Sequence, residues 1–472
     1  MEPHPRHPPS LSASVAVRAA AAFAVCAGLV LTAAAARGQT VTLSSSAVGS
    51  TPSVLGYNSG HFMPGSNTAS WWKYSGVNGG RIFSSPSYLT PGTSSYFRSG
   101  SSTALDATTQ SQFVAQRDAL RASGTATTYI RWDKITTLFT SGTTTGNNNI
   151  QLKYAEDSMK SLGVKPLIVM TRSPSSYPWP ATASANTASD WQDRWLAWQQ
   201  WYAQAFIHAQ YDNVENYQLF NEPDLYTSSS ATLSQEQWIE MMRYGANAIE
   251  SAIADVNRLY GKSLKAHVYG PVTNGPSTTS GDWGNTLLLN RTNQVITGPT
   301  PGYQLFDHFD YHNYGSSPAT FGTKLAGAIS DINTTTGGQG ASYPVTISEF
   351  NTRTSTDYTP NDPTNNPNNY TPDTLDMSSR LGQILVNLAN NKPDELYLFK
   401  FSNAGGANNG VYWQADSGSV NNVGGASRSA MAYQLFTEGF TANTLLKAPT
   451  SSDSALTMAA SSDAAELLSL AM

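Results

Sequence analysis

The chain has 472 residues, with 27 Lys and Arg against 32 Asp and Glu, so its formal net charge is −5. Charged residues make up 12% of it, about half the share of roughly 25% in ordinary globular domains, whereas aromatic residues reach 11%. This apolar and aromatic content argues against a disordered chain. The mildly acidic balance, without a run of Lys or Arg, argues against a nucleic-acid partner.

The N-terminus has the pattern of an export signal. Arg6 and Arg18 accompany an apolar run over Ala19–Ala36, whose last three alanines offer a small-residue cleavage site. We expect residues 1–38 to be a signal peptide, which predicts a secreted protein, extracellular or periplasmic, that leaves the membrane after cleavage. A membrane anchor, or a lipid anchor at Cys26, is the alternative. Cys26 is the only cysteine, so cleavage would leave no thiol for a disulfide, a metal site or a nucleophile.

Short apolar runs alternate with longer amphipathic ones along the rest of the chain. Eight runs are predicted to be strands: Val54–Asn58, Gly80–Phe83, Pro166–Met170, Glu215–Asn221, Ala266–Pro271, Phe306–Tyr314, Pro344–Phe350 and Glu395–Ser402. Helices are predicted at Thr68–Tyr74, Thr108–Ala122, Gln151–Leu162, Ser189–Gln210, Ser234–Tyr260, Phe321–Thr334, Pro372–Asn390 and Ser427–Gly439. Strands alternating with helices predict an α/β fold, a (β/α)₈ TIM barrel. Tyr129–Trp132 is a possible ninth strand.

The barrel is expected to occupy residues 39–445. Within it, Asn361–Thr371 is rich in Asn and Pro and predicts an exposed loop. Residues 446–472 hold two short strand patterns, Ala455–Ala459 and Leu467–Leu470. These patterns predict the start of a C-terminal β-sandwich-like region, truncated or packed on the barrel.

Two glutamates stand where predicted strands open into loops. In a TIM barrel the functional residues lie at the C-terminal ends of the strands. The fourth predicted strand ends in Asn221-Glu222, and the seventh runs into Glu349. Two carboxyl groups across a barrel mouth suit cleavage of a glycosidic bond, because one donates a proton and the other attacks or stabilises the anomeric carbon. The alternative is a pair of ordinary strand-end carboxylates.

The motif Asn221-Glu222-Pro223 on strand four and Glu349 on strand seven resemble the large clan of retaining glycoside hydrolases with (β/α)₈ barrels. The resemblance implies that Glu222 is the acid/base and Glu349 the nucleophile. It also implies that Asn221 hydrogen-bonds the 2-hydroxyl of the sugar, a contact that strengthens in the transition state.

Three more residues match this clan. Arg81 lies in the second predicted strand, and His312 and Tyr314 lie at the end of the sixth. Arg81 and the Tyr314 hydroxyl would favour the ionised form of the nucleophile. The structural alternatives are an ion pair within the barrel for Arg81 and an ordinary core histidine for His312.

The segment Leu55–Asn78 resembles the opening of the agarase and porphyranase family of that clan. The resemblance implies an endo-acting enzyme that cleaves β-1,4 bonds of red-algal galactan, agarose or porphyran, with β-sandwich domains after the barrel. One alternative keeps the mechanism and changes the polymer to xylan, mannan or β-glucan. Another is a non-catalytic carbohydrate-binding surface protein.

Many members of the clan carry a Trp at the end of strand eight, where this chain has Phe399-Lys400-Phe401. Aromatic side chains in predicted loops could instead stack on sugar rings, and charged ones could bind hydroxyls or a sulfate. The candidates are Trp132, Trp179, Trp413, His61, Arg172 and Lys400. Two-carboxylate hydrolysis needs no metal, and no His/Cys/Asp cluster shows ligand spacing, so we expect no cofactor. The expected partner is a polysaccharide, and the expected state is a monomer.

Overall fold

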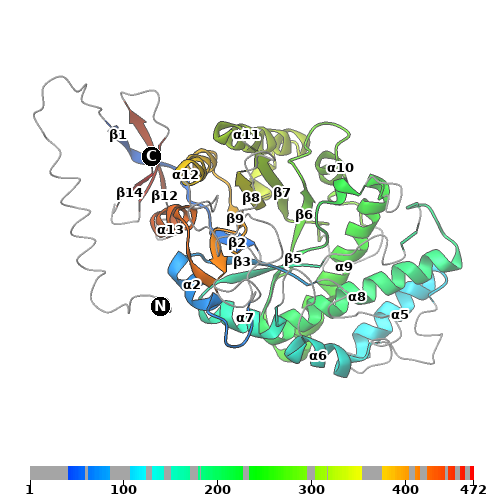
Figure 1. The fold of residues 1–472 in the computed structure, drawn as a ribbon. Helices are drawn as coiled ribbons and strands as arrows, with labels where there is room; N and C mark the ends of the chain where they lie inside the picture. The colour runs from blue at the N-terminus through cyan, green and yellow to red at the C-terminus, as the bar shows by residue number, and fades with distance from the viewer. Residues whose placement is uncertain are drawn as a thin grey trace, which may run out of the picture.

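The computed structural model describes residues 41–58, 62–84, 107–123, 130–142, 150–170, 179–180, 182–226, 233–294, 303–315, 317–352, 375–402, 410–414, 423–441, 445–451, 458–462 and 468–471. Within this part of the chain, eight parallel strands close into a barrel that is surrounded by helices (Figure 1). The predicted (β/α)₈ TIM barrel is confirmed. The expected signal peptide and the loop Asn361–Thr371 lie outside the described residues.

All eight predicted strands contribute to the barrel. They are β2 (Val54–Asn58), β3 (Gly79–Phe83), β4 (Lys165–Val169), β5 (Asn216–Gln218), β6 (His267–Thr273), β7 (His308–Gly315), β8 (Val345–Thr352) and β9 (Glu395–Phe399). Consecutive strands pair in parallel, and β9 closes the barrel on β2 with Val54 opposite Glu395. Strand β5 is shorter than predicted, because the chain leaves the ladder after Gln218. The residues that follow are therefore free to turn into the barrel mouth.

Helices cover the outside of the barrel. They are α2 (Thr68–Ser75), α5 (Gln110–Ser123), α6 (Trp132–Ser141), α7 (Leu152–Ser161), α8 (Ala188–Asp212), α9 (Gln235–Tyr260), α10 (Trp283–Asn290), α11 (Pro318–Thr335), α12 (Leu375–Asn390) and α13 (Arg428–Thr441). The two longest, α8 and α9, lie side by side (Figure 1). Each begins at a capping box, formed by Thr187 with Asp190 and by Ser234 with Gln237, which satisfies backbone N–H groups of the first turn.

Two helices of the described residues were not predicted, and one of them begins at Trp132, the last residue of the possible ninth strand, of which Ile130 forms only an isolated bridge. Helix α6 begins at Trp132, and its buried residues Trp132, Ile135 and Phe139 recur at the spacing of one helix face. That period, rather than the local β-propensity, decides the structure of the segment. The other is α10, a short helix of eight residues between β6 and β7.

A small antiparallel sheet lies beside the barrel, next to α12 and α13 (Figure 1). Its order is β1 (Val41–Ser50), β12 (Leu445–Ser451), β13 (Ala459–Ser462) and β14 (Leu468–Ala471). Its first strand comes from the N-terminal end of the segment that we expected to belong to the barrel. The C-terminal strands thus pair with an N-terminal strand of the same chain. They pack on the barrel, where Asn390 Nδ2 donates to the Met458 carbonyl at 2.9 Å.

Among the described residues, no helix combines the length and the apolar character that crossing a bilayer requires.

Candidate active site

Glu222 follows β5 in a strained backbone conformation. Its φ and ψ are 49° and 58°, in the left-handed region that residues other than glycine seldom adopt. The Glu222 N–H donates to the Val272 carbonyl at 2.8 Å, and its own carbonyl accepts from Leu225 N–H at 3.1 Å. Such strain costs about 1–3 kcal/mol and persists where the surroundings fix it, typically at functional sites. The turn holds Glu222 at the C-terminal end of β5, with its side chain 21% exposed.

Glu349 lies within β8 and is almost completely buried. Arg81, from β3, places Nη1 2.5 Å from Glu349 Oε1. The Tyr314 hydroxyl, at the end of β7, donates to Glu349 Oε2 at 2.7 Å. Each carboxylate oxygen therefore accepts a hydrogen bond from a fixed donor on a neighbouring part of the barrel.

The surroundings of Glu349 favour its ionised form. Burial by itself raises the pKa of Glu349, but the charges of His312 and Arg81 and the hydrogen bonds from Tyr314 and Arg81 outweigh burial and lower that pKa below its ordinary value. Burial and the neighbouring Glu349 charge raise the pKa of Tyr314 well above its usual range, so Tyr314 stays a neutral donor. Glu349 is thus held as a desolvated, oriented carboxylate, which suits a nucleophile.

His312 lies between the two glutamates. Its Nδ1 is 2.8 Å from Glu222 Oε1 and 3.5 Å from Glu349 Oε2. One donor atom from each of these three residues lies within 4.8 Å of the other two. Retaining glycosidases hold their carboxyl groups about 5–5.5 Å apart, and inverting ones about 6.5–9.5 Å apart. One carboxylate oxygen of Glu222 and one of Glu349 therefore lie within 4.8 Å of each other, and the retaining arrangement stays a prediction.

Arg81 is held by a chain of buried side chains beneath the two glutamates. Its Nη2 donates to Asn221 Oδ1 at 2.7 Å, and its Nε donates to Gln218 Oε1 at 2.6 Å. Gln218 in turn donates to Asp310 Oδ2, and Asp310 Oδ1 accepts from Ser348 N–H at 3.2 Å. Arg81, Gln218 and Asp310 are all fully buried. The chain fixes the guanidinium and, through it, both Glu349 and Asn221.

Sequence reasoning missed Gln218 and Asp310. Burial raises the pKa of Asp310 to about 6, an effect that the charges of Arg81 and His312 partly offset. The available signal was a polar side chain inside a predicted barrel strand, four residues before the strand-end glutamate in the case of Gln218. Such a residue inside a barrel must have a buried partner.

The structure brings together six of the predicted site residues: Glu222, Glu349, Asn221, Arg81, His312 and Tyr314. Lys400 directly follows β9, and the peptide bond that joins it to Phe399 is cis. Lys400 is buried, with Nζ 5.9 Å from the centroid of the Phe399 ring. Burial lowers the pKa of Lys400 to about 8.

Two of the predicted sugar platforms are engaged in packing. Trp132 is buried in the helix layer, with ring centroids 4.8 Å from Phe206 and 6.4 Å from Tyr202. It therefore does not offer a ring face to a sugar, which corrects our expectation. Trp179 is partly buried and packs on Trp201 and Tyr244, at 6.0 and 5.7 Å between centroids.

The remaining candidates are not placed. Trp413 belongs to β10 (Tyr412–Gln414), which pairs with β11 (Val423–Ala426), but its side chain lies outside the described part. His61 and Arg172 lie outside the described residues altogether.

Glu222, His312 and Glu349 offer donor atoms close enough for a metal ion. The guanidinium of Arg81 already neutralises Glu349, which makes this group a poor site for a cation. Two carboxyl groups in unlike surroundings, one buried and paired with arginine and one partly exposed beside histidine, suit a nucleophile and a proton donor.

The sequence matches no protein-family model and no curated protein. Solved structures nevertheless share its fold. A glucosidase from Croceicoccus marinus aligns with a TM-score of 0.51 at 14% identity, over 90% of this chain and 76% of the other. A family 39 glycoside hydrolase from the gut symbiont Bacteroides cellulosilyticus WH2 aligns with a TM-score of 0.51 at 10% identity, over 88% and 74%. At such identities the likeness establishes the fold alone.

Proposed function

We propose that this protein is a retaining glycoside hydrolase, with Glu222 as the acid/base and Glu349 as the nucleophile. One observation carries the proposal. Two glutamates from non-adjacent barrel strands meet at the C-terminal ends of the strands, with His312 Nδ1 between them. The fold that the chain shares with two glycoside hydrolases is consistent with it.

In the first step the ionised Glu349 attacks the anomeric carbon while Glu222 gives its proton to the leaving oxygen. The glycosidic C–O bond breaks, and a glycosyl ester forms on Glu349. This ester removes the negative charge beside Glu222. In the second step Glu222 takes a proton from water, which attacks the anomeric carbon and releases Glu349 as a carboxylate.

The neighbouring residues prepare these steps. Arg81 and Tyr314 orient Glu349 and keep it ionised before the sugar binds. Asn221 is oriented because its Oδ1 accepts from Arg81, so its amide group is directed by a fixed partner and can donate to the sugar 2-hydroxyl.

The substrate we propose is red-algal galactan, agarose or porphyran, cleaved internally at β-1,4 bonds. The support for it is the resemblance of Leu55–Asn78 to agarases and porphyranases. Specificity depends on loops around the barrel mouth, and a fold alone does not determine it. A secreted location and a monomeric state stay predictions of the sequence.

The experiment is a reducing-end assay of the purified chain on agarose and porphyran, with xylan, mannan and β-glucan in parallel. Release of oligosaccharides from the algal galactans alone supports the full proposal. Activity on a plant polymer alone keeps the mechanism and rejects the galactan. Binding of polysaccharide without hydrolysis would favour the carbohydrate-binding alternative.

A further inference from the structure

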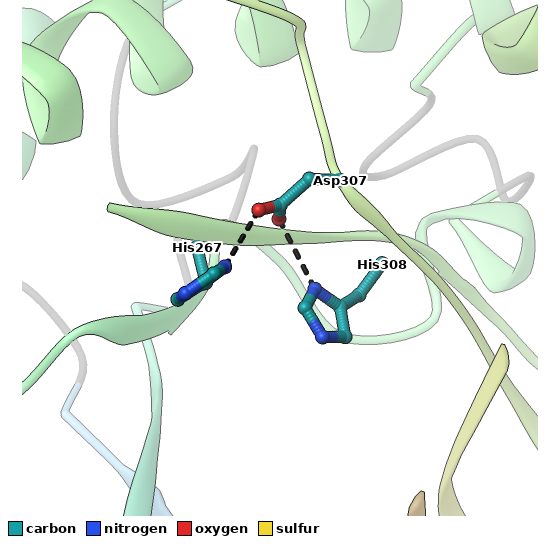
Figure 2. A group of neighbouring side chains, drawn as sticks. All are labelled: His267, Asp307 and His308. Atoms are coloured by element: carbon teal, nitrogen blue, oxygen red, sulfur yellow. Dashed lines mark hydrogen bonds and ion pairs between the residues drawn. The ribbon is translucent and has the colours of Figure 1, made fainter. Parts of the chain in front are cut away.

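A second group of ionisable side chains lies at the opposite end of the barrel from Glu222 and Glu349. His267 is the first residue of β6, and Asp307 and His308 stand at the start of β7. Figure 2 shows both imidazole rings directed at the Asp307 carboxylate. The proposed hydrolysis uses none of these residues.

The donor atoms of this group converge. His267 Nδ1 is 2.6 Å from Asp307 Oδ2, and His308 Nδ1 is 3.1 Å from Asp307 Oδ1. One donor atom from each residue lies within 4.8 Å of the other two. Ligands at the usual zinc distances of about 2.0–2.2 Å lie roughly 3.3 Å apart in tetrahedral geometry, so only small side-chain movements are needed to receive an ion.

Each donor is also held in orientation. The Val268 N–H donates to Asp307 Oδ1 at 2.9 Å, which fixes the carboxylate. The His308 ring stacks on Tyr269, with 4.2 Å between centroids. Because His267 and His308 belong to paired barrel strands, their backbones are rigid, and rigid ligands with supporting contacts characterise a prepared metal site.

The surroundings suit a cation that arrives from solvent. The His267, Asp307 and His308 side chains are 24%, 33% and 15% exposed. Asp307 forms part of the wall of a cavity of about 520 Å³ that also touches Tyr303 and Gln304.

The wider charge around His308 is negative as well. The charges of Asp394 and Glu395, at the start of β9, raise the pKa of His308, as the charge of Asp307 does. Both have other partners: Asp394 accepts from Val345 N–H at 2.7 Å, and Glu395 accepts from the Tyr269 hydroxyl at 3.1 Å. Three carboxyl groups, those of Asp307, Asp394 and Glu395, therefore act electrostatically on His308.

We propose that His267, Asp307 and His308 bind one divalent transition-metal ion of the zinc type, through two imidazole nitrogens and a carboxylate. Imidazole and carboxylate ligands without thiolate suit this class of ion, and three protein ligands leave a position for water. The ion links the N-terminal ends of β6 and β7. At that face of a TIM barrel it contributes to stability rather than to the reaction.

The test uses the full chain without a histidine tag, stripped with EDTA and titrated with Zn²⁺ in a calorimeter near pH 7.5. We expect one zinc ion per chain and a rise in apparent Tm with zinc concentration. His267→Gln and His308→Gln should each weaken zinc binding at least about tenfold and move the Tm rise to correspondingly higher zinc concentration. Absence of zinc binding by the wild-type chain would overturn the proposal.

Two control variants separate this site from other causes. Asp394→Asn removes a carboxylate that acts on His308 without removing a ligand, and it should bind zinc nearly as the wild type does. Glu349→Gln should also keep zinc binding, because the glutamates at the other end of the barrel belong to a different group. Loss of binding in Glu349→Gln with retention in His267→Gln would contradict the assignment.

A further measurement does not depend on whether the histidine variants fold. Zinc should protect His267 and His308 of the wild-type chain from modification by diethylpyrocarbonate, read by mass spectrometry of the peptides. Unchanged modification of both residues at saturating zinc would overturn the site.

Discussion

Arg81 and Glu349 form an ion pair inside the barrel, with Nη1 2.5 Å from Oε1 and the arginine fully buried. The same guanidinium contacts Asn221 and Gln218. One cation thus links the proposed nucleophile, a proposed sugar ligand and the interior of the barrel. Removing one partner of a buried pair typically costs about 3–5 kcal/mol, because the other charge is left without compensation.

The roles of the two glutamates can be separated by substitution. Glu349→Gln should lower turnover by about 10⁴-fold or more on any substrate, since both chemical steps use its carboxylate. Glu222→Gln should spare the first step on a 2,4-dinitrophenyl glycoside, whose leaving group needs no proton, and give a burst followed by slow turnover. A burst from Glu349→Gln, with none from Glu222→Gln, would exchange the assignments.

Tyr314→Phe should raise the pKa of Glu349, because the Tyr314 hydroxyl is one of the donors that stabilise its charge. The acid limb of the pH profile of kcat/KM should therefore move to higher pH. Tyr343→Phe is a matched control, since that hydroxyl donates to Gln304 at 2.6 Å, away from the glutamates. Equal profiles for wild type and Tyr314→Phe would contradict this account of Glu349.

The same pKa predicts the sign of a stability change. The pKa of Glu349 is lower in the folded chain than its ordinary value of about 4.3. Its contribution to stability is therefore present above about pH 4.3 and is lost as the pH falls through the lower folded-state value. Hydrogen bonds to charged groups contribute about 1.5–3 kcal/mol, so chemical unfolding at neutral pH should show a loss of this size in Tyr314→Phe.

Asp310→Asn tests the buried chain that positions Arg81. Asp310 accepts from both Gln218 and Ser348 N–H, so an amide there must present N–H to one of these donors. If the Gln218 amide flips to accept from the new amide at position 310, its NH₂ group then faces the Arg81 Nε–H, and two donors oppose each other. We expect a loss of stability of about 1–3 kcal/mol and a fall in kcat with little change in KM.

Glu395→Gln is the control for that variant. Glu395 is another buried carboxyl group inside the barrel, but it accepts from Tyr269 and Tyr397 rather than contacting the Arg81 chain. It should lower stability and leave kcat unchanged. Equal effects of the two substitutions on kcat would mean that Asp310 acts on folding alone.

Trp132→Ala tests whether this residue packs or binds sugar. Its ring is buried between α6 and α8, so truncation should destabilise the protein by about 3–5 kcal/mol. KM for the polysaccharide should not change in the folded fraction. A raised KM with unaltered unfolding would return Trp132 to the substrate site.

The barrel and the pair of strand-end glutamates could be predicted from the sequence, and the reasons are physical. Each barrel strand is a short apolar run between amphipathic helices, and the strand-end position of Glu222 and Glu349 follows from those runs. Trp132 was wrongly predicted to lie in a strand or loop, because the four residues Tyr129–Trp132 are too few to show a helical period. The ten residues of α6 show that period. Asp310 and the group at His267 depend on which strands lie side by side, and that relationship appears only when the barrel is closed.

The pairing of β1 with β12 could not be predicted from the sequence either. Val41 lies opposite Ser451, some four hundred residues away, and nothing local to β1 indicates that partner. Side-chain networks between distant strands share this property, since each member is an ordinary polar residue in its own segment.

The central claim is that Glu222 and Glu349 act together in a double displacement. The most direct test is proton NMR of the first reducing ends released from whichever polymer the enzyme cleaves, recorded before mutarotation. A β-linked substrate should give the β-anomer first, because two successive inversions retain configuration. Initial release of the α-anomer would contradict the assignment of Glu349 as a nucleophile, whatever the polymer.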